Sequence, residues 1–405
     1  MERLRLTDGT SAPRPRPRPD LALARFGTGV LLYEPARRRL HTLNTSAALV
    51  WRRLDGHTTL ADAAHSLTEI FASDHAVIEG DVAAVVQRFV ELGLLIVGDD
   101  PPEALPIADG VDEASRQLLA QLDAREWGSI SAMYQSVGLT FCVRSEDGEV
   151  ADAVARALRP LVGHGDDDVR ADHQYSIRQR IHDGAPQWRL YFDGTPIGTV
   201  GAVDAAVALL SWHISQATVE QTAGVLFLRA SAIQHRERVV ILPGESGTGK
   251  SILATALLRR GCEYLADNEA GVDVAVGRVL PYPAAIYVDS SAMRLFPGVT
   301  PTVAGALRSY LDPTDIAGSA IGAGGPVSLV VSPCYVAGGS TRLDRVVDID
   351  AVRLLLDNSF PFDNLGARGF HALVAIAQQA SMYRLTYSDL DAACEVVLDL
   401  MNELN

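Results

Sequence analysis

The stretch from residue 239 to 261, VVILPGESGTGKSILATALLRRG, constrains the fold more than any other part of this chain. Gly244, Gly249, Lys250 and Ser251 follow the spacing G-x-x-x-x-G-K-[ST], which is typical of a loop whose backbone N–H groups surround phosphates. The β-branched run RVVILP before the loop predicts a strand, and the apolar spacing of SILATALLRRG after it predicts a helix. We therefore expect an α/β domain with a phosphate site. The residues expected to contact the phosphates are Gly244, Glu245, Ser246, Gly247, Thr248, Gly249, Lys250, Ser251 and Ile252.

Lys250 is the sole lysine among the 35 lysines and arginines of the chain. Arginine carries a wide planar fork, whereas lysine carries a compact charge on a thin stem. This chain uses arginine for every other positive charge. We therefore expect its one lysine at a place where a slim cation has to reach between phosphates. The alternative is a glycine-rich turn with an incidental lysine. The spacing, the two flanks and the unique lysine together favour the phosphate site.

Composition bounds the possible functions. The 405 residues suffice for two or three domains, and the net charge of −15 argues against a broad nucleic-acid or anionic-membrane surface. The four cysteines stand far apart without a C-x-x-C pair, which excludes a disulfide framework or a zinc knuckle. Residues 1–20 have no apolar core of the kind that a signal peptide requires, and no later stretch approaches eighteen apolar residues. We expect a cytoplasmic protein.

The first hundred residues predict a tail and a small domain. Residues 1–20 end in alternating Pro and Arg, which predicts a disordered tail. LALARF, GVLLYE and RLHTLN then predict three strands, and three amphipathic stretches, TSAALVWRRL, TLADAAHSLTEIF and EGDVAAVVQRFVELGLL, predict three helices. This pattern indicates a winged-helix-like unit over residues 21–97.

The segment LHTLNTSAALVWRRLDG, followed by TLADAAHSL and FVELGLLI, resembles the PqqD-like peptide chaperones, also called RiPP recognition elements. The resemblance implies that the leader of a ribosomal precursor peptide binds as an added strand beside the third helix. It implies contacts from the third strand and the third helix. The corresponding residues here are Leu40, Thr42, Leu43, Val82, Val85, Val86 and Phe89. A place in the core is the alternative, favoured for Val85 and Phe89 and open for the strand residues.

Two segments separate this unit from the phosphate loop. Residues 98–115 are rich in Pro and acidic residues, which predicts a linker. Residues 116–220 predict an α+β subdomain, with helices in EVADAVARALRPL and VDAAVALLSWHISQATVEQT and strands in YSIRQRI, QWRLYFDG and TPIGTV. The acidic run HGDDDVRADH lacks metal-ligand spacing, so a solvated loop is favoured there.

Carboxylates follow the next predicted strand after the loop. Residues 264–266 predict a strand, and Asp267 comes directly after it. Because ligands gather at the carboxyl ends of strands in open α/β sheets, Asp267 is expected to face the phosphate site, with a turn aspartate as the alternative. Ser251 supplies a hydroxyl for Mg²⁺, and Asn268 and Glu269 supply further ligands.

The run LFLRASAIQHRERVVILPGESGTGKSILATALLRRGCEYLADNEAGV, with DNSFPFDNLGARGFHAL and YRLTYSDLD later, resembles the HPr kinases and the kinases of lasso-peptide precursors. The resemblance spans roughly residues 221–405 and implies an HPr kinase/PEP carboxykinase-like P-loop fold that binds ATP. It implies that Asp267 is the base that takes the proton of a serine hydroxyl. Asn268 stands where HPr kinases have a second Asp, and Arg229 where they have a His, which puts efficient HPr-type chemistry in doubt.

Arginines are expected to help neutralise the transferring phosphoryl group. Arg229 cannot act as an acid or base near neutral pH, but it can hold a phosphate. Arg342 and Arg368 are further candidates for phosphate contacts, with a surface ion pair as the alternative for each. Lys250, Mg²⁺ and these arginines would together form the charge-stabilising set.

The sequence thus predicts a two-part enzyme of RiPP biosynthesis. The N-terminal unit captures a precursor peptide, and the C-terminal domain transfers the ATP γ-phosphoryl group to a Ser or Thr hydroxyl. One alternative is a nucleotide-binding pseudokinase scaffold that delivers the peptide to other maturation enzymes; another is a small-molecule kinase acting on serine or a sugar. HPr kinases are homo-oligomers as a family, whereas this sequence leaves the oligomeric state open.

Overall fold

The computed structural model describes residues 14–26, 29–43, 45–56, 58–71, 75–96, 129–163, 171–182, 184–305, 308–316 and 319–403. Contacts divide the chain into two compact units. The first contains residues 1–107 and 366–374, and the second contains residues 108–365 and 375–405. The linker expected at 98–115 lies outside the described residues. Among the described helices, none is both long and apolar enough to cross a membrane.

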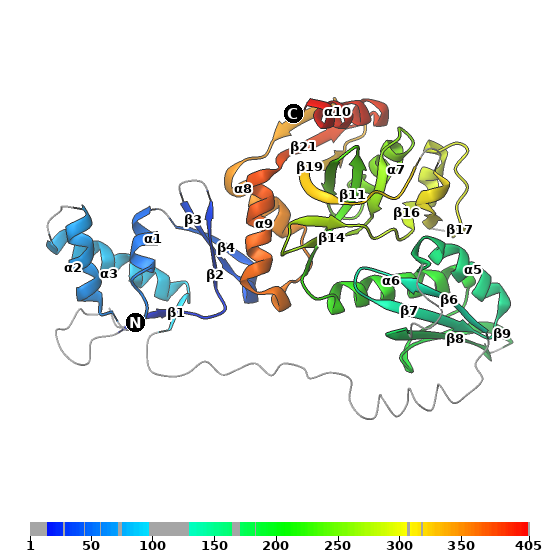
Figure 1. The fold of residues 1–405 in the computed structure, drawn as a ribbon, viewed down its shortest axis with the longest axis horizontal. Helices are drawn as coiled ribbons and strands as arrows, with labels where there is room; N and C mark the ends of the chain where they lie inside the picture. Colours follow the sequence, from blue (N-terminus) through cyan, green and yellow to red (C-terminus); the bar gives the residue numbers. More distant parts are fainter. Residues whose placement is uncertain are drawn as a thin grey trace. The chain divides into compact units, whose positions relative to one another are not determined.

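The first unit has the predicted strands and helices (Figure 1). Strands β2 (Ala22–Phe26), β3 (Gly29–Glu34) and β4 (Arg39–Leu43) form an antiparallel sheet in that order. Helices α1 (Thr45–Trp51), α2 (Leu60–Phe71) and α3 (His75–Glu91) follow. Their apolar faces share one core with the sheet, in which Trp51 packs edge-on against Phe89. The alternation and helical spacing of the sequence therefore predicted this unit correctly.

The expected disordered tail is wrong for the residues just before β2. Strand β1 (Arg16–Pro17) pairs with β5 (Leu95–Ile96), the strand after α3. Arg18 donates to the Gly93 carbonyl and, over 2.8 Å, to the Glu34 carboxylate, whose side chain is fully buried. The Pro/Arg repeat suggested solvation, but a buried carboxylate needs a cation and Arg18 supplies it.

We expect Arg18→Met to lower the free energy of unfolding of the first unit by about 2–4 kcal/mol, since removing one partner leaves a buried charge poorly compensated. Glu34 then keeps only Arg37 at 3.4 Å and His41 at 3.6 Å. Urea unfolding measures the change. The control is Arg88→Met, which breaks an exposed pair with Glu91 and should cost less than about 1 kcal/mol. Equal effects of the two substitutions would contradict the prediction.

The second unit begins with a five-stranded sheet, ordered β10-β9-β8-β7-β6. Its strands are β6 (Ser129–Gln135), β7 (Thr140–Ser145), β8 (His173–His182), β9 (Ala185–Phe192) and β10 (Thr195–Val200). Helices α5 (Gly148–Leu158) and α6 (Val203–Gln221) pack against this sheet, as Figure 1 shows. Both helices and the last three strands were predicted, whereas β6 and β7 were not.

A second sheet carries the glycine-rich loop. Strands β12, β11, β14, β15 and β19 close into a ring because β12 pairs with β19, and β21 and β20 extend it beyond β19. The bounds are β11 (Val225–His235), β12 (Arg238–Pro243), β13 (Glu263–Ala266), β14 (Glu269–Asp273), β15 (Arg278–Leu280), β19 (Gly325–Tyr335), β20 (Arg342–Arg345) and β21 (Ser381–Tyr387). Strands β12, β19 and β21 run parallel, so their carboxyl ends share one edge.

Helices and a small sheet surround this ring. Helix α7 (Lys250–Leu258) packs against α10 (Leu390–Glu403) and shares a core with β12, β19 and β21. The second unit also contains α8 (Asp348–Asp357) and the sheet of β16 (Ile286–Asp289), β17 (Val303–Ala304) and β18 (Arg308–Leu311). Helix α9 (Ala367–Gln379) is divided between the two units, with residues 367–374 in the first. The boundary expected at residue 220 does not separate compact units, since 129–220 belong to the same unit as the loop.

Candidate functional site

The glycine-rich loop, residues 244–249, joins β12 to α7 as the sequence predicted. Gly247 and Gly249 have φ of 88° and 94°, a region that L side chains rarely adopt. A Cβ on Gly249 would also clash with the Tyr387 hydroxyl. Lys250 opens α7 and is only 6% exposed. The loop therefore presents backbone N–H groups and one lysine at a helix N-terminus, an arrangement suited to a bound anion.

Asp267 lies directly behind the loop, at the end of β13. The Ser251 hydroxyl is 2.9 Å from both Asp267 carboxylate oxygens, and the Ser231 hydroxyl donates to the same carboxylate. Burial raises the pKa of Asp267, while Lys250 and the two hydroxyls oppose the shift. Asp267 is 1% exposed. The structure thus joins Asp267 to Ser251, but the carboxylate does not line the open cavity described next.

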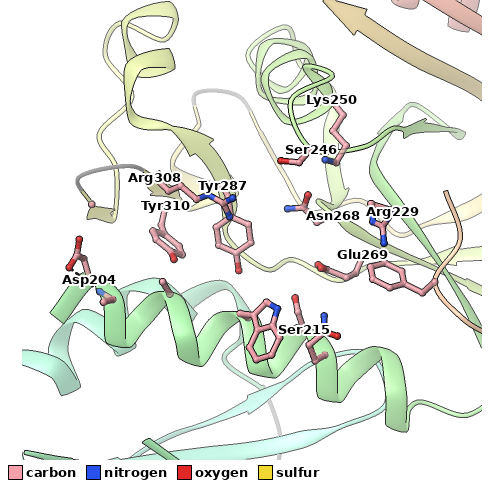
Figure 2. A pocket seen from close by; sticks show the side chains of 16 residues that line it. Asp204, Ser215, Arg229, Ser246, Lys250, Asn268, Glu269, Tyr287, Arg308 and Tyr310 are labelled. Atoms are coloured by element: carbon pink, nitrogen blue, oxygen red, sulfur yellow. Dashed lines mark hydrogen bonds between the residues drawn. The ribbon is translucent and has the colours of Figure 1, made fainter. Parts of the chain in front are cut away.

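A cavity of about 760 Å³ opens beside the loop, and Figure 2 shows its walls. One wall is the loop with the strand ends around it, the opposite wall is α6, and β16 and β18 close the side. The lining residues are Asp204, Ala205, Ala208, Trp212, Ser215, Gln216, Arg229, Ser246, Lys250, Asn268, Glu269, Tyr287, Gly305, Arg308, Tyr310 and Phe360. The cavity is large enough for a small ligand or a side chain with its flanking backbone.

Glu269 is the carboxylate that lines this cavity on the side of the glycine-rich loop, whereas Asp204 lines it from α6. Glu269 lies across from Arg229 in the β11–β14 ladder, and Figure 2 shows both side chains in the cavity wall. Burial raises the pKa of Glu269 to about 8, against the opposing influence of the Ser215 hydroxyl and the Lys250 and Arg229 charges. In the described part of the chain, Glu269 Oε2 has no hydrogen-bond partner. At neutral pH this carboxyl is therefore mostly protonated, and its carboxylate form, the one that can accept a proton, predominates only above about pH 8.

Arg229, expected near the transferred phosphate, is anchored at the edge of the loop. Its carbonyl accepts from the Gly244 N–H over 3.2 Å, and its guanidinium carbon lies 5.2 Å from the centre of the Phe360 ring. Arg342 and Arg368 do not line the cavity. Arg342 is exposed on β20 and pairs with Asp344 at 2.8 Å, and Arg368 is exposed on α9. Of the three arginines, Arg229 alone joins the site.

Several cavity residues were missed by sequence reasoning. Asp204 and Trp212 come from α6, Tyr287 from β16, and Arg308 and Tyr310 from β18. None has a motif of its own. A mild signal was Trp212, a large aromatic that stays 58% exposed on a helix otherwise rich in small residues.

The oxygen donors near the loop fit a hard divalent cation. The Ser251 hydroxyl and the Asp267 carboxylate are adjacent, and within the described residues Glu269 Oε2 has no hydrogen-bond partner. Asn268, in contrast, directs its amide N–H at Asp267 over 3.3 Å, so its nitrogen does not serve as a ligand. Mg²⁺ keeps several waters and takes only one or two protein carboxylates, so a dense cluster is not required. Within the described residues, no group of three or more His, Cys, Asp and Glu side chains gathers as a metal site.

Comparison with known proteins bears on the first unit. Residues 29–95 match the family model described as coenzyme PQQ synthesis protein D (PqqD). This segment is a PqqD-like domain. A solved structure described as lasso peptide synthetase B1 complexed with the leader peptide is 30% identical, covering 20% of this chain and 98% of that one, with a TM-score of 0.20. No curated protein matched the chain.

The predicted peptide contacts of the PqqD-like domain divide into two groups. Leu43, Val82, Val86 and Phe89 are buried in the core. Leu40 and Val85 are half-buried, and Thr42 is exposed. Strand β4, which carries Leu40 and Thr42, pairs with β3 on one side and is the last strand of its sheet in the described chain. Leu40, Thr42 and Val85 are therefore the members whose side chains remain accessible.

Proposed function

We propose that this chain is an ATP-dependent kinase that phosphorylates a Ser or Thr hydroxyl of a ribosomal precursor peptide, captured through its leader by the PqqD-like domain. The observation that carries the proposal is the pairing of Ser251 with Asp267 behind a glycine-rich loop that opens onto a cavity. The PqqD match supports leader binding and a place in RiPP biosynthesis. The accessible edge of β4 suits a peptide that adds as a strand.

The residues around the loop take separate roles. The backbone N–H groups and Lys250 would bind the triphosphate, and Ser251, with Asp267 behind it, would hold Mg²⁺. When bound, Mg²⁺ would offset charge on the phosphate oxygens. Arg229 adds positive charge at the cavity wall, where its guanidinium is kept in place by Phe360.

The proton acceptor in this proposal is Glu269. The HPr kinase resemblance places the base at Asp267, but both oxygens of that carboxylate are held by hydroxyls and the residue is 1% exposed. Glu269 lines the cavity, and its buried Oε2 has no hydrogen-bond partner among the described residues. The acceptor oxygen bonds to the γ-phosphorus as the bond from that phosphorus to the ADP oxygen breaks, and the hydroxyl proton passes to Glu269.

The proposal is tested by incubating a candidate precursor peptide with protein, ATP and Mg²⁺ and measuring the intact mass of the peptide. A gain of one phosphate is the expected result. An unchanged mass, with ATP still bound, would favour the second candidate, a nucleotide-binding scaffold. The observation behind that candidate is Asn268, which lines the cavity where HPr kinases have an acid.

Leader capture has its own test. We expect Leu40→Asp to raise the KM for the full precursor at least about tenfold with little change in kcat, because tethering acts through effective concentration. A peptide without its leader is the internal control and should react equally with both proteins. The matched variant is Arg39→Asp. Arg39 is the exposed neighbour of Leu40 on the same strand, and its side chain points to the opposite face of the sheet. Equal effects of the two variants would contradict the role of Leu40.

A further inference from the structure

Outside the cavity, Tyr335 forms an exposed aromatic surface beside the glycine-rich loop. Tyr335 ends β19 and is 54% exposed, and Val336 after it is 43% exposed. The Tyr335 N–H donates to the Thr248 carbonyl over 3.3 Å. A Cβ built on Gly249 would lie 3.6 Å from Tyr335 Cβ, so the tyrosine is packed against the loop itself. Neither Tyr335 nor Val336 lines the cavity.

Tyr335 is held in place by a buried partner. Its ring meets the Tyr387 ring at 71°, with the ring centres 5.8 Å apart. Tyr387 is 2% exposed, and its hydroxyl donates to the Gly249 carbonyl over 3.4 Å. The Val336 N–H donates to the Tyr387 carbonyl. The exposed aromatic ring is therefore fixed relative to the loop before any ligand arrives, which lowers the ordering cost of binding.

The sheet topology gives this surface a direction relative to the loop. Strand β12 pairs with β11 on one side and with β19 on the other. Strand β11 carries Arg229, which lies across from Glu269 on β14, and β19 ends at Tyr335. Since β12, β19 and β21 are parallel, the loop and both tyrosines stand at one edge, where ligands of α/β sheets bind. A triphosphate held by the loop with its terminal phosphate toward Glu269 would direct the rest of the nucleotide toward β19.

We propose that Tyr335, with Val336 beside it, forms the base subsite and stacks on the adenine of the nucleotide. The inference rests on the proposed function, because the loop must first hold a triphosphate. Stacking on an aromatic ring is typically strong enough to change affinity by about tenfold or more. A hydroxyl is not needed for stacking, so Tyr335→Phe should keep the subsite and Tyr335→Leu should lose most of it.

Affinities for ATP and for inorganic tripolyphosphate, each with Mg²⁺, test the assignment on the full chain. We expect Tyr335→Ala and Tyr335→Leu to weaken ATP binding about tenfold or more and to leave tripolyphosphate binding within about twofold, with Tyr335→Phe close to the wild type. The control is Val276→Ala, an equally exposed apolar residue in the β14–β15 turn, which should change neither affinity.

Three outcomes would overturn the inference. Unchanged ATP affinity in Tyr335→Ala and Tyr335→Leu would show that the base lies elsewhere. Equal losses for ATP and tripolyphosphate would make Tyr335 a support of the loop rather than a base contact. Failure of the wild-type chain to bind either ligand would remove the proposed function, and the inference with it, and is distinct from the first two results.

Discussion

Lys250→Ala is expected to lower phosphotransfer by about 10²–10³-fold and to weaken ATP binding. The reason is geometric as well as electrostatic. Lys250 is 6% exposed at the first position of α7, in line with the loop glycines, so no other cation in the described loop can replace it. Removal of one preorganised charge contact typically costs 10²–10³-fold. Isothermal titration with ATP and a mass-based transfer assay measure the two effects separately.

Lys250→Arg makes this test specific to the shape of the cation. If charge alone mattered, arginine would rescue activity in a chain that uses arginine everywhere else. We expect a loss nearly as large as that of alanine, because the planar fork does not fit between phosphates as the ammonium does. Arg259→Ala, which removes an exposed cation at the other end of α7, is the control and should retain full activity. An active Lys250→Ala protein would contradict the assignment.

Asp267→Asn and Glu269→Gln are expected to fail in different ways. Asparagine at 267 keeps the size of the side chain but weakens the support of Ser251, so both Mg²⁺-dependent ATP affinity and transfer should fall, transfer by about 10²-fold or more. Glutamine at 269 cannot take a proton, so transfer should fall by about 10²–10⁴-fold while ATP affinity stays near normal. Binding and single-turnover measurements separate the two patterns.

An inverted result would restore the role that the family resemblance implies for Asp267. If Glu269→Gln transferred phosphate normally and Asp267→Asn bound Mg²⁺-ATP normally without transfer, Asp267 would be the base. The control is Glu237→Gln, an exposed carboxylate in the turn between β11 and β12 that does not line the cavity. It should leave both properties unchanged.

Asp267→Asn and Glu269→Gln should not lower the stability of the fold. Burial raises the pKa of each carboxyl, so the charged forms are disfavoured in the folded state. A raised folded pKa for an acid means that stability is present at low pH and declines as pH rises from the unfolded value toward the folded one. For Glu269 that window runs from about 4.5 to about 8. Neutral replacements remove the penalty, and thermal unfolding at pH 8 should show an unchanged or raised Tm.

The local elements were predictable because their causes are local. Alternation fixed β2, β3 and β4, and the β-branched run RVVILP gave β12 its observed bounds, Arg238–Pro243. The position of Asp267 after a strand was also predicted, since a strand end can be recognised from neighbouring residues. Its contact with Ser231 was not, because that contact depends on the pairing of β11 with β13.

The cavity could not be predicted for the same reason. Arg308 and Trp212 lie about sixty and forty residues from Lys250 in the sequence, on elements that come together only through packing. The pattern of α6 predicted a helix, but a periodicity does not say which face lines a ligand site. The ion pair between Arg18 and the buried Glu34 was also missed. The composition of residues 1–20 describes the segment as a whole and does not identify the partner of one residue.

Helix α6 forms one wall of the cavity. It therefore determines the shortest part of the chain that retains the whole cavity. A fragment cut at residue 221 would keep the glycine-rich loop, Asp267 and Glu269, yet it would leave Asp204, Trp212 and Ser215 behind. Under the proposed function, such a fragment would bind the nucleotide beside an open face, where water would compete with the acceptor alcohol. To direct the proposed activity at another peptide, the chain from about residue 129 onward should therefore be retained as one piece.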